Sequence, residues 1–247
     1  MPSIAVCTLG CKVNQYDTQA MLELFQQAGY EAVAFDEAAD VYLVNTCTVT
    51  GTGDQKSRQM IRRAHRRNPF AGIIVAGCMA QRAAETLLLP GVRLILGTQN
   101  RKDVVRLLDK AMAQAEPLIA VKALREADFE TLSIRASEGR TRAALKIQEG
   151  CDQHCTYCII PSVRGPVRSR PLQDVREEAA RLAEHGFQET VLTGIHLSSY
   201  GRDLGNVGLP DALEALERTA GIARVRLGSL EPNLITPEFV QKLHGYE

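Results

Sequence analysis

The chain has 247 residues, of which 45% are hydrophobic, and its formal net charge at pH 7 is zero. This length suffices for one large domain or two ordinary ones with a sizeable core. No run of about 18 apolar residues occurs, which excludes a membrane-spanning helix, and the opening MPSIAVCTLG lacks the features of a signal peptide. Seven cysteines without a secretory signal indicate a reducing cytosol, in which thiolates serve as ligands.

Strand-like and helix-like segments alternate through the first 115 residues. Short apolar strands are predicted at 3–8, 41–45, 72–76 and 92–96. Helices are predicted from Asp17 or Thr18 to Ala28 with Gly29 as the stop, over 54–67, after 78, and over 101–115. This alternation is typical of a parallel sheet with covering helices.

A cysteine follows the carboxyl end of each of the first three predicted strands, namely Cys11, Cys47 and Cys78. Parallel strands end on one edge of a sheet, and the loops there form the ligand crevice of open α/β sheets. We therefore expect these thiols to meet in space. The alternative is three unrelated buried thiols, since cysteine is often simply buried. Cys7 lies inside the first strand and is interpreted as a core thiol.

Residues 116–142 are polar and lack a clear period, which predicts a linker that includes at most a short hairpin. Alternation then resumes, with strands at 143–147, 189–193 and 223–227 and helices at 171–185, 209–220 and from 236 onward. The predicted fold class is therefore α/β: a parallel domain over 1–115, the linker, and an incomplete barrel over 143–247.

A second cysteine set lies in one loop, GCDQHCTYCIIPSVRG, at 150–165. Cys151, Cys155 and Cys158 are spaced C-x₃-C-x₂-C, which presents three thiolates to one compact inorganic group. A [4Fe–4S] cluster is normally held by four cysteines, so three leave one iron open. Two alternatives are a thioredoxin-like pair of the last two cysteines and a zinc site that includes His154. The predicted strand before the loop favours a cofactor loop.

With Tyr157 before its last cysteine, this loop resembles the signature of radical S-adenosylmethionine (radical SAM) enzymes. The segments TLGCKVNQYD, NTCTVT and GCMAQ are similar to the amino-terminal domain of the radical SAM methylthiotransferases. The resemblance implies two [4Fe–4S] clusters. The cluster on Cys151, Cys155 and Cys158 would bind SAM and release a 5′-deoxyadenosyl radical. An auxiliary cluster, on Cys11, Cys47 and Cys78, would deliver the methylthio group.

Further residues are candidates for holding SAM. The resemblance implies that Tyr157 lies near the adenine. Gly194, at a predicted strand end, allows close backbone approach. Ser229 and Glu231 follow the third barrel strand and are candidates for hydrogen bonds to the ribose hydroxyls or the amino group. Arg164 is a candidate partner of the methionine carboxylate.

Basic residues are candidates for contacts with RNA phosphates, which position a nucleic acid without reading its sequence. Arg58, Arg62 and Arg66 recur on one face of a predicted helix, and Arg168 and Arg170 follow the cluster loop. The alternative for each arginine is a solvated surface charge. His196 lies in a polar loop and has no predicted role.

The resemblance implies insertion of a methylthio group into an unactivated C–H bond, with no catalytic residue beyond the cluster ligands. TLGCKVNQYD and TGIHLSSYG are most similar to the branch that acts on C2 of N6-threonylcarbamoyladenosine at position 37 of tRNA. Alternatives are the branches that act on isopentenyladenosine 37 or on a ribosomal-protein aspartate, and an inactive iron–sulfur fragment. The implied partners are the tRNA anticodon loop and an electron donor such as flavodoxin or ferredoxin, in the cytoplasm and without a membrane.

Only three barrel strands are predicted before the chain ends at Glu247, about half of what a radical SAM barrel needs, and no β-rich RNA-binding (TRAM) domain follows. The expectation is therefore an amino-terminal fragment whose third barrel strand is an exposed edge. Cluster binding would survive in such a fragment, whereas turnover and tight tRNA binding would not.

Overall fold

The computed structural model describes residues 1–49, 51–125, 127–134 and 142–246, which divide into two compact units. The first unit comprises Met1–Leu132 together with His154–Arg164, and the second comprises Ser133–Gln153 with Gly165–Glu247. The segment that carries Cys155 and Cys158 therefore packs with the first unit, although its neighbours in sequence belong to the second.

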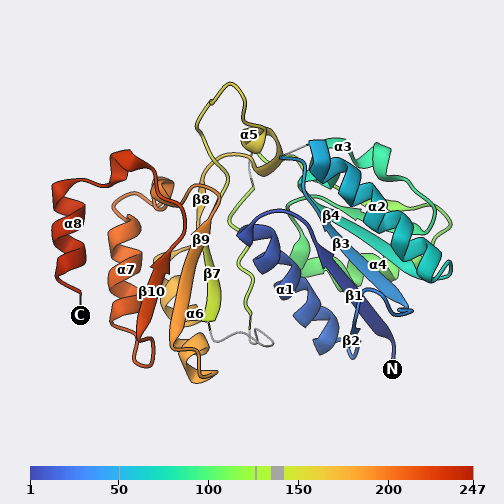
Figure 1. The fold of residues 1–247 in the computed structure, drawn as a ribbon, viewed down its shortest axis with the longest axis horizontal. Coiled ribbons are helices and arrows are strands. Elements are labelled where there is room, and N and C mark those ends of the chain that lie inside the picture. The colour runs from blue at the N-terminus through green and yellow to red at the C-terminus, as the bar shows by residue number, and fades with distance from the viewer. Residues whose placement is uncertain (50, 126, 135–141, 247) are drawn as a thin grey trace. The chain divides into compact units, whose positions relative to one another are not determined.

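Six parallel strands form the sheet of the first unit, in the order β2-β1-β3-β4-β5-β6 (Figure 1). They are β1 (Ser3–Thr8), β2 (Glu31–Val33), β3 (Val41–Thr46), β4 (Gly72–Gly77), β5 (Val92–Leu96) and β6 (Leu118–Ala120). The helices are α1 (Lys12–Gln27), α2 (Gly51–Arg67), α3 (Cys78–Ala83), α4 (Val104–Met112) and α5 (Ile160–Arg164), with 3₁₀ turns η1 (Ala84–Leu87) and η2 (Arg101–Asp103). This confirms the predicted parallel α/β domain.

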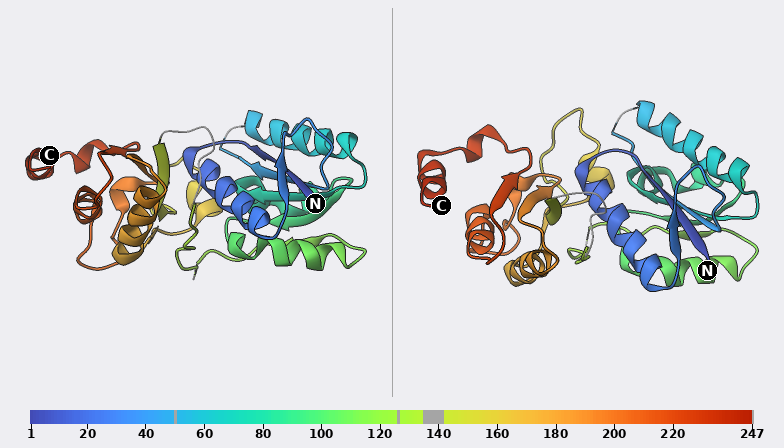
Figure 2. Two further views of the ribbon diagram at one scale, coloured as in Figure 1. Left: turned by 90° about the horizontal axis from the view of Figure 1, so that it is seen from below. Right: turned by 60° about the horizontal axis from the view of Figure 1, so that its bottom comes forward.

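Side chains of the central strands alternate between two hydrophobic cores, one on each face of the sheet. Tyr42 and Val44 of β3 pack with α2 and α3, whereas Val41 and Leu43 pack with α1 and α4. The alternation follows from the two-residue period of a strand. Because both faces are covered, every residue of β3 and β4 is buried. Figure 2 shows α2 on one side of this sheet and α1 and α4 on the other.

Two local predictions for this unit are wrong. α1 begins at Lys12 instead of at Asp17 or Thr18, so Asp17 lies inside the helix, where it is buried. The predicted linker contributes β6, and the chain beyond it remains packed on the first unit, where the Tyr16 hydroxyl donates to the carbonyl of Leu132. A few isolated apolar residues in a polar stretch are enough for this packing, but they form no periodic pattern from which a strand could be predicted. Residues 126 and 135–141 of the predicted linker lie outside the described residues.

The second unit contains a smaller sheet in the order β10-β9-β7-β8. β7 (Arg142–Glu149), β9 (Glu189–Gly194) and β10 (Arg224–Leu227) are parallel, as predicted, and the two-residue β8 (Arg168–Ser169) adds an unpredicted antiparallel edge. The helical elements are α6 (Leu172–Glu184), α7 (Leu209–Glu217) and α8 (Pro237–His244), with η3 (Leu197–Ser199) and η4 (Pro232–Leu234). β10 is an edge strand, as the sequence predicted.

Apolar side chains of α6 and α7 cover the second sheet, among them Val175, Leu182 and Leu216. Within β7 the buried Lys146 ammonium lies 2.7 Å from the Glu149 carboxylate, so the two charges compensate each other where water is excluded. Throughout the described part of the chain, no helix combines the length and the apolar character needed to cross a bilayer.

Candidate metal centre

Three cysteines of the first unit lie just beyond the carboxyl ends of adjacent strands. β1, β3 and β4 are paired in register to their last residues, Thr46 of β3 lying opposite Gly77 of β4. Cys47 and Cys78 follow these two residues directly, and Cys11 lies three residues beyond β1. The structure thus brings all three to one edge of the sheet, as the strand pattern predicts.

The three thiols also influence one another electrostatically. Burial raises the pKa of the Cys78 thiol, the adjacent Arg164 guanidinium lowers it, and the charges of Cys11 and Cys47 raise it again. Cys78 is buried, Cys47 is half-buried and Cys11 is exposed. The group of thiols therefore spans the distance from the protein interior to the surface, and a ligand can reach it from solvent.

Two glycines allow the backbone to hold these cysteines. Gly10 has φ +103°, and a Cβ there would lie 2.9 Å from Cβ of Cys47. Gly77, directly before Cys78, has φ +95° and ψ −160°, a region that is essentially restricted to glycine. A Cβ at this position would lie 2.3 Å from Oδ1 of Asn45. Neither close approach is possible with a side chain.

We expect Gly77→Ala to destabilise the first unit by about 2–5 kcal/mol, because backbone strain and steric displacement of Asn45 add. The matched control is Gly29→Ala. Gly29 also has a positive φ, of +88°, but a Cβ there meets nothing within 4 Å. The control should lose only about 1–2 kcal/mol from strain. Urea unfolding followed by circular dichroism measures both, and equal losses would contradict the steric argument.

Asparagine side chains tie the cysteine-bearing loops together. Nδ2 of Asn14 donates to the carbonyls of Leu9 and Thr46, at 2.7 and 2.9 Å. Nδ2 of Asn45 donates to the carbonyl of Asn14 and to the Thr18 hydroxyl, both at 3.0 Å. These bonds satisfy buried loop carbonyls and connect the residues around Cys11 with those around Cys47.

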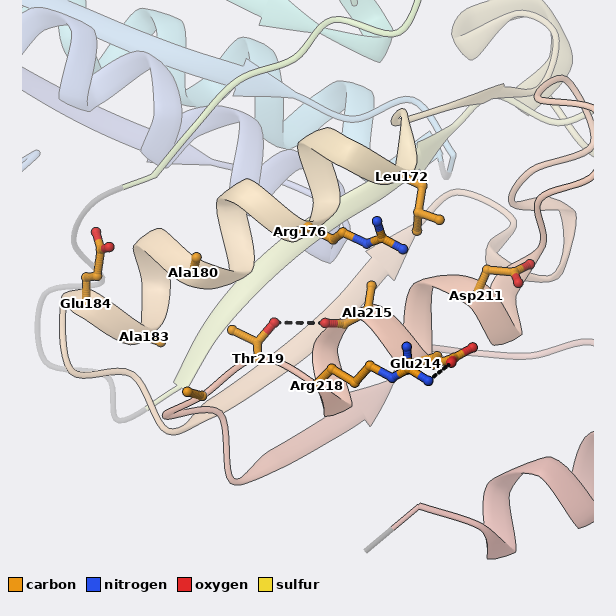
Figure 3. A pocket seen from close by; sticks show the side chains of 11 residues that line it. Leu172, Arg176, Ala180, Ala183, Glu184, Asp211, Glu214, Ala215, Arg218 and Thr219 are labelled. Carbon is orange, nitrogen blue, oxygen red and sulfur yellow. Dashed lines mark hydrogen bonds and ion pairs between the residues drawn. The ribbon is translucent and has the colours of Figure 1, made fainter.

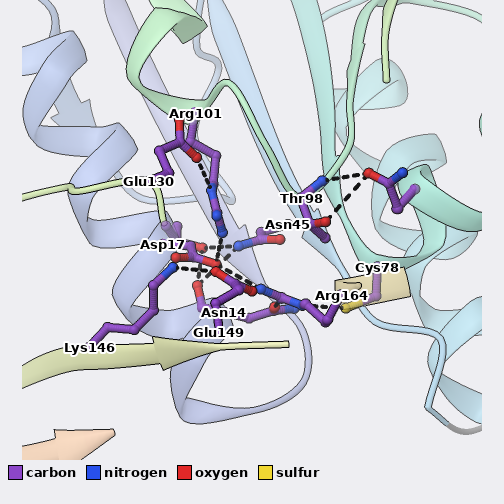
Figure 4. A network of polar contacts seen from close by, with 12 residues as sticks. Asn14, Asp17, Asn45, Cys78, Thr98, Arg101, Glu130, Lys146, Glu149 and Arg164 are labelled. Atoms are coloured by element: carbon purple, nitrogen blue, oxygen red, sulfur yellow. Dashed lines mark hydrogen bonds and ion pairs between the residues drawn. The ribbon is translucent and has the colours of Figure 1, made fainter. Parts of the chain in front are cut away.

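A buried ionic network lies beside Cys78 (Figure 4). Nε of Arg164 donates to Sγ of Cys78 at 3.1 Å, and its terminal nitrogens bind Asp17, at 3.2 Å, and Asn14. Asp17 also binds Arg101, whose Nε lies 2.9 Å from the Glu130 carboxylate. Arg164 has an exposed fraction of 0% and Asp17 of 1%. These partners differ from the methionine carboxylate that the sequence suggested for Arg164.

The segment His154–Arg164 holds two of the three loop cysteines. Cys155 is exposed and Cys158 half-buried, and the amide of Cys158 donates to the carbonyl of Cys155 at 3.0 Å. The segment is held to the first unit by α5, which packs against α3, and by the hydroxyl of Thr98, 3.0 Å from the carbonyl of Val163. Tyr157 is 89% exposed, so its ring is accessible to a ligand.

Cys151, the first cysteine of the loop, belongs to the second unit and is buried. Its amide donates to the carbonyl of Gly165 at 3.0 Å, and its Sγ accepts the amide of Gln153 at 3.4 Å. Oδ1 of Asp152 accepts the amide of Val167. The loop is thus closed at its base.

Within the described ranges, no group of three or more His, Cys, Asp or Glu side chains is arranged to hold a single metal ion.

Among the candidate SAM residues of the second unit, Gly194 is the last residue of β9, and Ser229 and Glu231 lie beyond β10. A Cβ at Gly194 would lie 2.9 Å from Gln148, so the close approach there is to this side chain. Oε1 of Gln148 accepts the amide of His196, whose Nε2 lies 3.4 Å from the exposed Glu231. Ser229 is exposed. Sequence reasoning missed Gln148 and His196, because only the parallel pairing of β7 and β9 brings them together.

The predicted phosphate-binding arginines fall into two groups. Arg62 and Arg66 are exposed on α2, and Arg58 is half-buried and donates to the carbonyl and hydroxyl of Thr86. Arg168 and Arg170 are buried in the second unit instead, where Arg170 lies 3.3 Å from Glu178. The expectation that these last two face phosphate is therefore corrected: both side chains are buried, and Arg170 compensates the charge of Glu178 inside the fold.

A groove of about 760 Å³ lies between α6 and α7 (Figure 3). Its floor includes Ala180 and Ala215, and charged side chains of both signs line it, among them Arg176 and Glu214. It lies on the helical layer, whereas the candidate site residues of this unit lie at the strand ends, so we assign it no part in the metal centre.

Two known families match this chain. Residues 3–97 match the family described as "Uncharacterized protein family UPF0004", and residues 145–247 match the Radical SAM superfamily. Among solved structures, the radical S-adenosylmethionine methyltransferase TsrM from Kitasatospora setae aligns with a TM-score of 0.64 over 98% of this chain and 59% of its own. At 13% sequence identity, this similarity concerns the fold alone. The chain thus carries a match to the UPF0004 family, followed by a match to the Radical SAM superfamily.

Curated relatives narrow the class. The threonylcarbamoyladenosine tRNA methylthiotransferases MtaB of Bacillus subtilis and Aquifex aeolicus are 46% and 41% identical, over 98% and 99% of this chain. The tRNA-2-methylthio-N(6)-dimethylallyladenosine synthase of Moorella thermoacetica is 36% identical over 95%. Over nearly its whole length the chain is therefore similar to proteins named as tRNA methylthiotransferases. It spans 54%, 60% and 54% of the length of these three relatives.

Proposed function

We propose that this chain carries the two cluster-binding regions of a radical SAM methylthiotransferase that modifies C2 of N6-threonylcarbamoyladenosine at position 37 of tRNA. The observation that carries the proposal is the convergence of Cys11, Cys47 and Cys78 at one sheet edge, in a chain that also contains the C-x₃-C-x₂-C loop. An electron-transfer protein needs no open iron, whereas three cysteine ligands would leave one iron open at each site.

The residues at the first site fit an iron–sulfur cluster. Three thiols are soft ligands suited to iron, and the guanidinium of Arg164 donates to one of them at 3.1 Å. A buried cation at a sulfur atom suits an anionic group, because charge-assisted hydrogen bonds favour the charged acceptor. We therefore assign Cys11, Cys47 and Cys78 to the auxiliary [4Fe–4S] cluster.

The loop cysteines Cys151, Cys155 and Cys158 would hold the second [4Fe–4S] cluster, an assignment that rests on their spacing. When bound, the two clusters and SAM would supply the 5′-deoxyadenosyl radical and the methylthio group. The role of the protein is to bind and orient them and to exclude water. The accessible ring of Tyr157 is assigned to the adenine.

Beyond Tyr157, SAM contacts are assigned to Gly194, Ser229 and Glu231, because they end or follow parallel strands at the carboxyl edge of the second sheet. Glu231 lies 3.4 Å from His196, so its carboxylate is held by a neighbour that can be protonated. An exposed carboxylate of this kind can accept hydrogen bonds from ribose hydroxyls without a change in the fold.

The tRNA would contact the exposed arginines of α2. Arg62 and Arg66 lie one turn apart on the solvent face of a helix whose opposite face, including Ile61 and Ala64, is buried in the core. Phosphate contacts from such a stripe position the RNA, while the modified base is read elsewhere. An anticodon-loop base can be splayed into a pocket and stacked there. For a protein that modifies such an RNA, we propose the cytoplasm as its location and flavodoxin or ferredoxin as its electron donor.

The decisive experiment is mass spectrometry of tRNA nucleosides from cells with and without the gene. Loss of 2-methylthio-N6-threonylcarbamoyladenosine, with N6-threonylcarbamoyladenosine accumulating in its place, supports the proposal. Loss of the 2-methylthio group from isopentenyladenosine would assign the chain to the other tRNA branch. An unchanged tRNA profile together with a mass shift on a ribosomal protein would refute an RNA substrate.

A further inference from the structure

The buried Arg164 has a role that the cluster ligands alone do not explain. A guanidinium removed from water costs several kcal/mol unless it is fully paired. Arg164, at 0% exposure, meets that cost with acceptors from two elements: Asn14 and Asp17 of α1, and the sulfur of Cys78 at the start of α3. Its planar fork is therefore fixed in one orientation, with Nε aimed at the sulfur.

Within this network, the sulfur of Cys78 is the partner of Arg164 whose charge can change. Two guanidiniums, Arg101 and Arg164, meet two carboxylates, Asp17 and Glu130, and all four side chains are buried. The positive charge is thus compensated without Cys78, and the hydrogen bond to Sγ can strengthen when that sulfur becomes negative. Hydrogen bonds to ligand sulfurs and local charge are among the determinants of the reduction potential of a cluster.

Arg164 also ends the segment that carries Cys155 and Cys158. Apart from α5, this segment is a loop and turn, so it depends on a few side-chain anchors. Arg164 is the last residue of the segment, and its side chain reaches α1 and α3 of the first unit. The hydroxyl of Thr98 donates to the carbonyl of the neighbouring Val163. One guanidinium therefore contacts an assigned auxiliary ligand and anchors the chain that bears two loop ligands.

We propose that Arg164 is a positioning residue for the auxiliary cluster: its Nε–H bond to Cys78 raises the reduction potential of that cluster, and the same side chain holds the segment His154–Arg164 on the first unit. The proposal rests on the function proposed above, because it takes Cys78 as a cluster ligand. It adds a residue outside both cysteine sets to the machinery and gives it a measurable electrostatic effect.

The test uses a background in which only the auxiliary cluster can form, with Cys151, Cys155 and Cys158 all replaced by alanine. In this background we compare Arg164→Met with Arg101→Met after anaerobic reconstitution. Arg101 is the matched control, because it is equally buried and shares Asp17, while its second partner is the carboxylate of Glu130. The midpoint potential is measured by a redox titration followed by electron paramagnetic resonance, and iron and sulfide are counted.

We expect Arg164→Met to shift the midpoint to a more negative potential and Arg101→Met to leave it near that of the parent. Equal shifts in both variants, or none in Arg164→Met, overturn the electrostatic role. A parent that binds no cluster would refute the auxiliary site and this inference together, whereas a loaded parent with an unchanged midpoint in Arg164→Met refutes the inference alone.

Hydrogen exchange of the cluster-free protein with all cysteines intact tests the anchoring role without relying on iron. Amides of residues 155–163 should exchange at least tenfold faster in Arg164→Met than in Arg101→Met, because only the former loses the anchor of this segment. Arg164→Lys keeps the positive charge but lacks the planar guanidinium with its several donors. The exchange rates of these amides in Arg164→Lys should therefore fall between those in Arg164→Met and in the parent. Equal exchange in the Met variants would show that α5 packing alone holds the segment and would overturn this role.

Discussion

Cys47→Ala should leave the reductive cleavage of SAM intact while abolishing methylthio transfer, and Cys155→Ala should abolish both, in a version of the chain extended to the length of its curated relatives. The reason is that the two cysteines belong to different sets: Cys47 directly follows β3, and Cys155 lies in the C-x₃-C-x₂-C loop. Each variant should lose one cluster, seen as about half of the iron and sulfide of the parent. The measurements are iron and sulfide content, 5′-deoxyadenosine release and 2-methylthio nucleoside formation.

Cys7→Ala is the matched control for these variants. Cys7 lies within β1, and burial raises the pKa of its thiol, while the charge of Arg63 lowers it. It should keep both clusters and both activities. If Cys47→Ala cleaved no SAM while retaining the loop cluster, the division of roles between the sites would be wrong.

Asp17→Ala should destabilise the first unit by about 3–5 kcal/mol, because it leaves two buried guanidiniums without their shared carboxylate. Asp17 accepts from both Arg101 and Arg164 and is 1% exposed. The control is Asp36→Ala, which removes the partner of the exposed Arg63 and should cost at most about 1 kcal/mol. Urea unfolding midpoints report both, and a loss below about 1 kcal/mol for Asp17→Ala would show that water enters the network.

Four strands of the first unit, β1, β3, β4 and β5, and the meeting of the cysteines followed from local patterns in the sequence, whereas β2 and β6 did not. β3 and β4 are short apolar runs bounded by turn residues. In a parallel sheet, residues that directly follow the strands lie at the same edge, so the cysteines after these strands are expected to meet there. The positive φ of Gly29 likewise agrees with the predicted end of α1.

The buried charges were not predictable in this way. Asp17 near a helix start reads as a cap in sequence, and only partners 84 and 147 residues away, Arg101 and Arg164, explain why it is buried inside α1. Arg168 and Arg170 also read as surface charges in the sequence, although the structure buries both side chains. β6 and β8 are too short to show a period, so their pairing is decided by the strands already in place.

The contact between Arg164 and Asn14 joins residues 150 positions apart, which has a consequence for synthesis on the ribosome. At about 5–20 residues per second, Arg164 is made roughly 8–30 s after Asn14. The parallel strands that carry Cys11, Cys47 and Cys78 can pair during this interval, but the site still lacks its guanidinium. A nascent chain that acquired iron then would hold it with an incomplete environment around Cys78, so metallation is expected to favour chains that have been extended past residue 164.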